Sequence, residues 1–502
     1  MQAISITQIE QQLNKGNLIC VTVCPTWCLR NYLLPITDTN QKRPSRLDCY
    51  EKNLHMNSNS SELLAKAGEK HRAGNKLAAK GNDTDALSYY QQTLDIAPNF
   101  ADAWANRGMA EARLGLNDLA QMSFIRAAEL MPEHPAVLNT IGNQLFTLLA
   151  FDSAAMCYMW ATKADPTFIN AWNNLGNTYL QLLQLEDAIS AYEQAITLNP
   201  THADAKNGYA QALLMNGNFN PGWAAYEARF DKPDSPPRRA YASTEWMGQT
   251  LQGKSILLYA EQGIGDTIQF MRFANHLKGM GARIIIECQK DICELVSTIP
   301  SIDQAIPLND LTPSTNYHAP LMSLPYLLKL TDTASLASAS YIKIDASQIQ
   351  KLEKVRIGLV WAGNPNHVND GNRSIPLEEF SPLFDRPDVD VVSLQFGKAL
   401  SQIQNTTMLD VLGKDPSFFD LAQAIANLDL LITADTASSH LAGAMGYPCW
   451  VLLPFVPDWR WMLHKNDTHW YSSIRLFRQK NRGDWGSVIH DVSMALNIYK
   501  KK

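Results

Sequence analysis

A period of 34 residues in the first half of the chain constrains its fold more than any other feature of the sequence. Four kinds of residue keep this period: a glycine, an alanine, an aromatic residue and a proline. The positions are Gly74, Gly108, Gly142 and Gly176; Ala86, Ala120, Ala154 and Ala188; Tyr90, Phe124, Tyr158, Tyr192 and Tyr226; and Pro98, Pro132, Pro166 and Pro200. A repeat of this length predicts one pair of antiparallel helices per unit, stacked into an all-α solenoid.

Each recurring residue has a physical role in such a pair. Small residues let two helices cross closely, the ring fills the space between them, and proline separates the units because it cannot continue a helix. The pattern resembles the tetratricopeptide repeat over about residues 67–230. The resemblance implies a concave surface that binds a peptide or a partner protein. Asparagines are the candidate contacts, although exposed asparagine is equally typical of plain solvent surface: Asn106, Asn139, Asn173 and Asn174.

The last repeat unit, which begins near Ala203, departs from the pattern. Gly222 stands where the alanine belongs, and residues 217–223 replace the usual turn between the helices. Such a degenerate terminal unit is expected to cap the solenoid or to dock onto a neighbouring domain. The segment 231–244 then concentrates proline and charge, which predicts a linker.

From residue 245 onward, apolar runs of strand length alternate with amphipathic stretches. The runs are 255–260, 283–287, 355–361, 389–394, 428–433 and 449–453. The alternation predicts two α/β domains with parallel sheets, at 245–350 and 351–502. Because ligands bind such sheets at the carboxyl ends of the strands, we expect the active site in the cleft between the domains. We predict a multidomain chain: an N-terminal segment at 1–60 that is partly disordered, an all-α solenoid at 61–230, and this α/β pair.

Three motifs in the second half carry a further resemblance. They are GIGDTIQFMRFA at 263–274, NRSIPLEEF at 372–380 and ADTASSHLAGAMGYP at 434–448. Together they resemble the signature regions of glycosyltransferase family 9, the heptosyltransferase-like group, over about residues 245–485. The resemblance implies a GT-B fold of two Rossmann-like domains and a metal-independent, inverting sugar transfer. The segment LPFVPDWRW at 453–461 resembles a subgroup in which this domain follows tetratricopeptide repeats.

An inverting transfer needs a base that takes the proton of the acceptor hydroxyl. The resemblance implies that Asp266 is this base, on an acceptor-side loop that contains Gly263 and Gly265. Two other interpretations stay open. The glycine pair also begins a dinucleotide-binding G-x-G-x-x-G motif, with Glu287 as the acid that binds ribose, but Ile268 occupies the third glycine position. Alternatively, Asp266 only caps the helix that follows it.

The leaving nucleotide diphosphate needs positive charge or the N–H groups of a helix N-terminus. The resemblance implies that Asp435, Thr436 and His440 bind the donor, and the small Ser438 lets the helix backbone approach it. Plain capping by Asp435 or Thr436, with His440 packed against the sheet, is the alternative.

Two residues on the preceding elements complete the predicted donor site. Arg373 lies in a glycine- and asparagine-rich loop and is expected to neutralise phosphate, unless it is simply solvated. Gln395 ends a strand beside Phe396 and is expected to border the nucleotide base, although a strand-end aromatic is more often part of the core.

Composition and charge exclude several other classes of protein. A net charge of -6 argues against a general nucleic-acid binder, and no apolar run reaches the roughly 18 residues of a membrane span. The N-terminus lacks the basic start of a secretory signal, so we expect a cytoplasmic location. The spacing of Cys20, Cys24 and Cys28 differs from that of zinc-binding pairs, and with Cys49 they are predicted to be reduced thiols, with no metal site in the chain.

These observations predict a bacterial-type enzyme that moves a sugar from a nucleotide-diphospho-sugar to an acceptor hydroxyl, without a cofactor. The acceptor is a protein or a glycan, and the repeats recruit a protein partner. A catalytically silent scaffold with a GT-B-like domain is the first alternative. A nicotinamide-dependent oxidoreductase is the second, and Ile268 disfavours it.

Overall fold

The computed structural model describes residues 58–232, 238–337, 339–344, 354–406 and 408–499. The predictions of disorder for the segment before residue 58, and of reduced thiols at Cys20, Cys24, Cys28 and Cys49, lie outside these residues. The chain divides into two compact units: Met1–Pro132 with Thr140–Cys157, and Glu133–Asn139 with Tyr158–Lys502. The division passes through two helices, α8 (Pro135–Thr147) and α9 (Phe151–Ala164), so residues 158–230 belong to the same unit as both predicted α/β domains.

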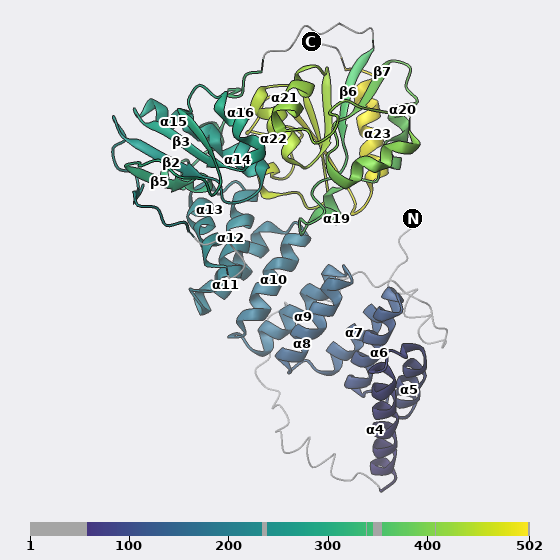
Figure 1. Cartoon of the computed structure of the whole chain (residues 1–502). Coiled ribbons are helices and arrows are strands. Elements are labelled where there is room, and N and C mark those ends of the chain that lie inside the picture. The colour runs from purple at the N-terminus through teal and green to yellow at the C-terminus, as the bar shows by residue number, and fades with distance from the viewer. Residues whose placement is uncertain (1–57, 233–237, 338, 345–353, 407, 500–502) are drawn as a thin grey trace, which may run out of the picture. The chain divides into compact units, whose positions relative to one another are not determined.

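The first unit is built from paired helices, as the repeat period predicts (Figure 1). Close packing at the recurring glycines explains the pairing. A Cβ atom added to Gly74 would lie 2.8 Å from the ring of Tyr90, and one added to Gly108 would lie 2.9 Å from the ring of Phe124. Only glycine therefore allows the ring to fit at this crossing. The helices are α4 (Ser58–Ala78), α5 (Asp83–Ile96), α6 (Ala101–Arg113) and α7 (Asn117–Leu130).

The second unit continues the repeats with the same packing. A Cβ atom added to Gly176 would lie 2.7 Å from the ring of Tyr192. Its helices are α10 (Ile169–Gln181), α11 (Leu185–Leu198), α12 (Ala203–Met215) and α13 (Phe219–Tyr226), and the 3-10 helix η1 (Glu227–Asp231) follows α13. We refer to α12, α13 and η1 together as the terminal repeat.

Two all-parallel sheets follow, which confirms the predicted α/β architecture (Figure 1). The N-terminal lobe, residues 244–344, has the strand order β1-β5-β2-β3-β4. Its strands are β1 (Thr244–Glu245), β2 (Ser255–Tyr259), β3 (Arg283–Cys288), β4 (Gln304–Pro307) and β5 (Tyr317–Pro320). Its helices are α14 (Ile264–Phe270), α15 (Ala274–Gly279), α16 (Cys293–Ser297), α17 (Leu324–Leu327) and α18 (Thr333–Leu336).

The C-terminal lobe, residues 354–499, has the strand order β11-β10-β9-β6-β7-β8. Its strands are β6 (Val355–Val360), β7 (Val389–Ser393), β8 (Leu409–Asp410), β9 (Leu430–Ala434), β10 (Cys449–Leu453) and β11 (Ile474–Arg478). Its helices are α19 (Asp370–Arg373), α20 (Ser381–Phe384), α21 (Phe418–Ala426), α22 (Ala437–Met445) and α23 (Trp485–Leu496).

In both sheets the order in which strands are added reverses beside the first long strand. From β2 the chain moves through β3 to β4 and then returns to β5 on the other side of β2. From β6 it moves through β7 to β8 and then returns to β9 on the other side of β6. Loops at the carboxyl ends of strands that flank such a switch point diverge and leave room for a ligand. The sheet topology therefore selects the loops after β2, β5, β6 and β9.

The terminal repeat packs against both lobes through aromatic side chains. Trp223 on α13 contacts Phe270 of the N-terminal lobe with ring centroids 6.3 Å apart, and Trp459 of the C-terminal lobe at 5.5 Å. Tyr226 lies against the same Trp459 ring at 5.7 Å. All four rings are buried. Of the two expectations for the degenerate unit, capping and docking, the structure shows docking.

Candidate functional site

Asp266 lies in the first turn of α14, directly after β2. Its Oδ2 atom accepts a hydrogen bond of 2.9 Å from the backbone N–H of Gly263, which is the N-cap residue. The helix starts at Ile264 and not at Thr267, so Asp266 is not its N-cap as the capping interpretation expected; it lies at the third position of the helix and bonds back to the N-cap residue. The other carboxylate oxygen, Oδ1, forms an ion pair with Arg460. Asp266 thus both bonds to the N-cap residue of α14 and faces a cation from the opposite lobe.

Arg460 belongs to the candidate site, although the sequence analysis did not select it. It lies on the 3-10 helix η7 (Trp459–Trp461), and its side chain is only 8% exposed. Its Nε donates to Gln269 at 2.6 Å, its Nη1 to Asp458 at 2.9 Å and its Nη2 to Asp266. Burial opposes the charge, but the carboxylates of Asp458 and Asp266 offset it and raise the pKa of Arg460. The arginine links the two lobes at the predicted base.

The segment 435–440 follows β9 and begins α22. Thr436 is the N-cap residue, and its Oγ1 accepts from the backbone N–H of Ser438 at 3.3 Å, so capping by Thr436 is confirmed. Ser438 is buried. A Cβ atom added to Gly265 would lie 3.4 Å from the Cα of Ala437, which shows how closely α14 and α22 approach. The small residues in both motifs bring Asp266 and the α22 N-terminus together.

His440 is buried, and its environment keeps it neutral. The ring stacks on Trp461 with centroids 5.3 Å apart, and its Nδ1 lies 3.0 Å from the hydroxyl of Tyr471. Burial, followed by the nearby cations Arg460 and Arg272, holds the pKa of His440 well below its ordinary value. At neutral pH the imidazole therefore offers hydrogen bonds and no positive charge. The packed interpretation of this residue agrees with its burial.

Asp435 and Arg373 meet at the carboxyl ends of β9 and β6. Burial, followed by the charge of Asp458, raises the pKa of Asp435 to about 7. Arg373 donates from Nη1 to the backbone carbonyl of Asp435 at 3.2 Å and pairs through Nε with Asp370 at 3.2 Å. Its side chain is largely buried, so it is not the freely solvated arginine of the alternative interpretation.

His367 shows that the loops from both lobes converge. Burial and Arg373 lower the pKa of His367, while the carboxylates of Asp370, Asp458 and Asp266 act in the opposite direction. One side chain in the loop after β6 therefore senses charges from the loop after β2 and from the segment after β10. The predicted residues Asp266, Arg373 and Asp435 lie in one electrostatic neighbourhood.

Gln395 differs from the expectation that it borders a nucleotide base. Its Oε1 accepts from the backbone N–H groups of Trp361 at 3.0 Å and Ala362 at 2.9 Å, and its Nε2 donates to the carbonyls of Ala362 and Phe396, both at 2.9 Å. These bonds use both donors and both acceptor lone pairs of a buried amide. Gln395 therefore fixes the start of the loop after β6 and leaves no group for a ligand.

The dinucleotide-binding alternative loses its acidic residue. Glu287 is buried, and its Oε2 accepts from Arg239 at 2.9 Å and from the Tyr241 hydroxyl. Its Oε1 accepts from the backbone N–H of Asn309 at 3.2 Å. Ile268, at the third glycine position, is buried in the core. The carboxylate that would bind a ribose is already occupied by protein groups.

The asparagine side chains form hydrogen bonds between neighbouring repeats, within each of the two compact units. In the first unit, Asn106 donates to Asn75 at 3.0 Å and lies 2.9 Å from His71. In the second unit, Asn174 donates to Asn139 at 3.0 Å. Asn173 lies 3.4 Å from the side-chain oxygen of Asn174.

Within the described part of the chain, no group of three or more histidine, cysteine, aspartate or glutamate side chains is arranged to hold a metal ion. Nor does any described helix combine the length and the apolar character needed to cross a membrane.

Comparison with known proteins supports the repeats directly. Models of the tetratricopeptide repeat match residues 71–135 and 169–202, so the chain contains tetratricopeptide repeats. A curated relative, Protein FlbA of Caulobacter vibrioides, is 25% identical over 327 residues, which cover 58% of this chain and 54% of FlbA. The chain therefore spans about half the length of this curated relative.

Structural comparison aligns about a third of the chain with solved structures. MamA from Desulfovibrio magneticus is 22% identical, with a TM-score of 0.28, over 32% of this chain and 90% of that chain. YrrB, described as a TPR protein with an unusual peptide-binding site, is 19% identical, with a TM-score of 0.29, over 33% and 86%. PilF of Pseudomonas aeruginosa is 21% identical, with a TM-score of 0.27, over 34% and 77%.

Proposed function

We propose that the chain is a glycosyltransferase that moves a sugar from a nucleotide-diphospho-sugar to an acceptor hydroxyl, with the donor bound between the two lobes. One observation carries the proposal. Asp266, Arg373 and Asp435 follow β2, β6 and β9, which border the switch points of the two sheets. The charges of Arg373 and of Arg460, the ion-pair partner of Asp266, both act to lower the pKa of Asp435. The switch points are the place where an α/β pair binds its ligand.

The N-terminal lobe supplies the proposed base. Asp266 is oriented by the Gly263 N–H and by Arg460, which hold its two oxygens from opposite sides. Each oxygen keeps a second lone pair, and one of these would accept the proton of the acceptor hydroxyl as the sugar is transferred. Once Asp266 is protonated, Arg460 would keep the carboxylate of Asp458 as its counter-charge.

The C-terminal lobe supplies the proposed donor site. The first turn of α22 presents backbone N–H groups, and Arg373 adds a positive charge beside the end of β9. Both stabilise negative charge on a leaving diphosphate. Because the pKa of Asp435 is raised to about 7, this residue carries a proton in a large fraction of molecules at neutral pH. In that form it donates a hydrogen bond to an oxygen of the donor.

The repeats are suited to protein–protein interaction, and in this proposal they recruit the acceptor protein. A catalytically silent scaffold is the second candidate function. The observation that favours it is that both carboxylate oxygens of Asp266 already hold a protein contact, one with the Gly263 N–H and one with Arg460. An enzyme must release or share one of these contacts during turnover, whereas a scaffold need not.

The test is donor binding by the purified chain, without added metal, measured as a thermal shift with UDP-, GDP-, ADP- and CMP-linked sugars. One nucleotide class should raise the melting temperature, and Arg373→Ala should reduce that shift by removing the cation beside the diphosphate. Arg356→Ala is the matched control. Arg356 lies near the amino end of β6, at the opposite end of the strand from the loop that carries Arg373, and pairs with Asp390 on β7. Wild-type protein that responds to no donor and releases no nucleotide diphosphate would favour the scaffold.

A further inference from the structure

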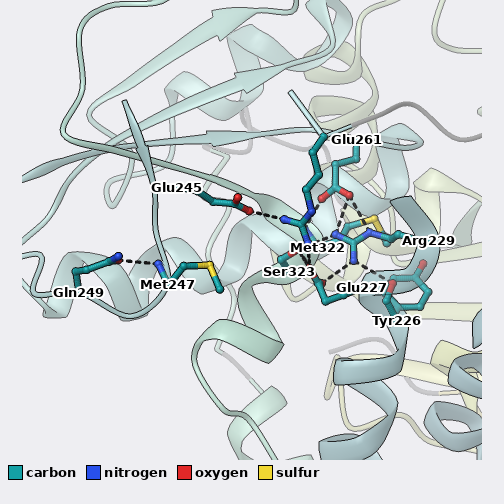
Figure 2. Close-up of polar contacts among 10 residues, drawn as sticks. Tyr226, Glu227, Arg229, Glu245, Met247, Gln249, Glu261, Met322 and Ser323 are labelled. Carbon is teal, nitrogen blue, oxygen red and sulfur yellow. Dashed lines mark hydrogen bonds and ion pairs between the residues drawn. The ribbon is translucent and has the colours of Figure 1, made fainter. Parts of the chain in front are cut away.

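We propose that the terminal repeat is an integral part of the site rather than only an adaptor, with Arg229 as the positioning residue for residues 261–266, the loop after β2 and the first turn of α14. Figure 2 shows Arg229 facing Glu261 and Ser323. Glu261 opens the loop that leads to Asp266. Because Asp266 is the proposed base, the catalytic part of this inference rests on the proposed function, whereas its structural part does not.

One guanidinium reaches both loops that flank the switch point of the N-terminal sheet. Arg229 donates from Nε to Glu261 Oε2 at 2.8 Å, in the loop after β2. It also donates from Nη2 to Ser323 Oγ at 2.8 Å, in the turn after β5. Its Nη1 donates to Glu227 at 2.7 Å, which anchors the guanidinium to η1. The strands β2 and β5 are neighbours, so the repeat ties together the two ends between which a ligand would lie.

The ion pair between Arg229 and Glu261 is inside the protein. The two side chains are 4% and 5% exposed. Burial raises the pKa of Glu261, and the charge of Arg229 opposes that effect. Glu261 Oε1 also accepts from the backbone N–H of Met322 at 3.1 Å, so this carboxylate bridges the repeat and both loops. Removing the arginine would leave a buried carboxylate without its cation, which is strongly destabilising at that place.

The same repeat also supports the other partner of Asp266. Trp223 and Tyr226 pack on Trp459, the residue before Arg460. Asp266 is therefore held by a loop and by an arginine that both rest on the terminal repeat. Polar contacts position the loop, and aromatic contacts position the segment that carries Arg460.

Hydrogen–deuterium exchange of the full-length protein tests this role without any substrate. Arg229→Met and Glu261→Gln should each speed amide exchange in residues 262–270 by at least about tenfold, because a buried pair loses one partner. Lys232→Ala is the control, at the residue that directly follows η1. Lys232 pairs with Asp204 at 3.3 Å near the surface, and this change should leave the exchange of the loop unaltered.

The double variant, Arg229→Met with Glu261→Gln, separates positioning from general damage. If the two residues act through one contact, its effect on the loop should be smaller than the product of the two single effects. Unchanged exchange at residues 262–270 in folded single variants overturns the proposal. A uniform rise of exchange throughout both lobes also overturns it, because the role would then be structural only.

Kinetics test the catalytic part. Arg229→Met should lower kcat by about 100-fold through misplacement of the base, with the KM for the donor within about twofold of wild type. A donor KM that rises in step with the loss of kcat would contradict the positioning role. If the wild-type protein transfers no sugar from any nucleotide donor, the proposed function fails, and the exchange measurement still decides whether Arg229 holds the loop.

Discussion

Asp266 and Asp435 lie in different lobes, and the protein treats the charges of their carboxylates differently. Each follows a strand beside the switch point of its sheet. Asp266 faces the guanidinium of Arg460 and a backbone N–H, so its negative charge is compensated. Asp435 is desolvated and lies near the charge of Asp458, while Arg373 bonds to its backbone carbonyl. One lobe is built to hold a charged carboxylate and the other to favour a neutral one.

The comparison predicts that removing the compensating cation has the largest effect. Arg460→Met removes the buried guanidinium that Asp266 and Asp458 share, and because these two carboxylates are 20% and 38% exposed we expect the free energy of unfolding to fall by about 3 kcal/mol. Urea denaturation at pH 7 measures it. Arg475→Met is the control, because Arg475 is exposed on β11 and contacts only the rings of Trp450 and Phe477 among the contacts described. Equal effects of the two variants would show that Asp266 needs no compensation.

The opposite result is expected at Asp435. Its pKa rises from an ordinary value of 3.8 to about 7 on folding, so between these values the folded chain holds a proton that the unfolded chain has lost. Wild-type stability therefore falls as pH rises through this window. Asp435→Asn removes this dependence, so the free energy of unfolding of the variant should rise relative to that of wild type by about 2.5 kcal/mol between pH 5 and pH 8. Thermal or urea unfolding at the two pH values measures the difference. A difference that is the same at both pH values would place Asp435 with the compensated carboxylates.

The smallest effect concerns the cap of α22. Thr436→Ala removes the side-chain acceptor of the Ser438 N–H, and we expect a loss of about 1 kcal/mol, measured by urea denaturation. Thr436→Ser keeps the hydroxyl and should recover most of the stability. If alanine is tolerated as well as serine, the α22 terminus does not depend on this cap in the absence of a donor.

The repeats could be predicted in detail because their signal is periodic and local. The contact of Gly74 with Tyr90 recurs at Gly108 with Phe124 and at Gly176 with Tyr192. The central strands were also predictable from their apolar runs. Shorter strands such as β5 were not predicted, because Tyr317–Pro320 contains a histidine and a proline. The edge strand β11 was hidden by the arginines in its alternating sequence.

The candidate site was predictable only in part. Motif resemblance and sheet topology locate Asp266, Arg373 and Asp435. The burial of Gln395 and the neutrality of His440 depend on neighbours that are distant in sequence, so a strand end or a helix start does not reveal them. Arg460 lies 194 residues after Asp266, and no local pattern connects the two. The pair formed by Arg229 and Glu261 spans the proline-rich segment that, in the sequence, looks like a plain linker.

That pair has a consequence for how such a chain can be inherited. Recombination of genes at the proline-rich segment would separate Arg229 from Glu261 and leave each buried charge facing a foreign partner. The terminal repeat must therefore be inherited together with the two lobes for this buried ion pair to form. Truncated genes intended to express the lobes alone should therefore begin before Ala203, where α12 starts.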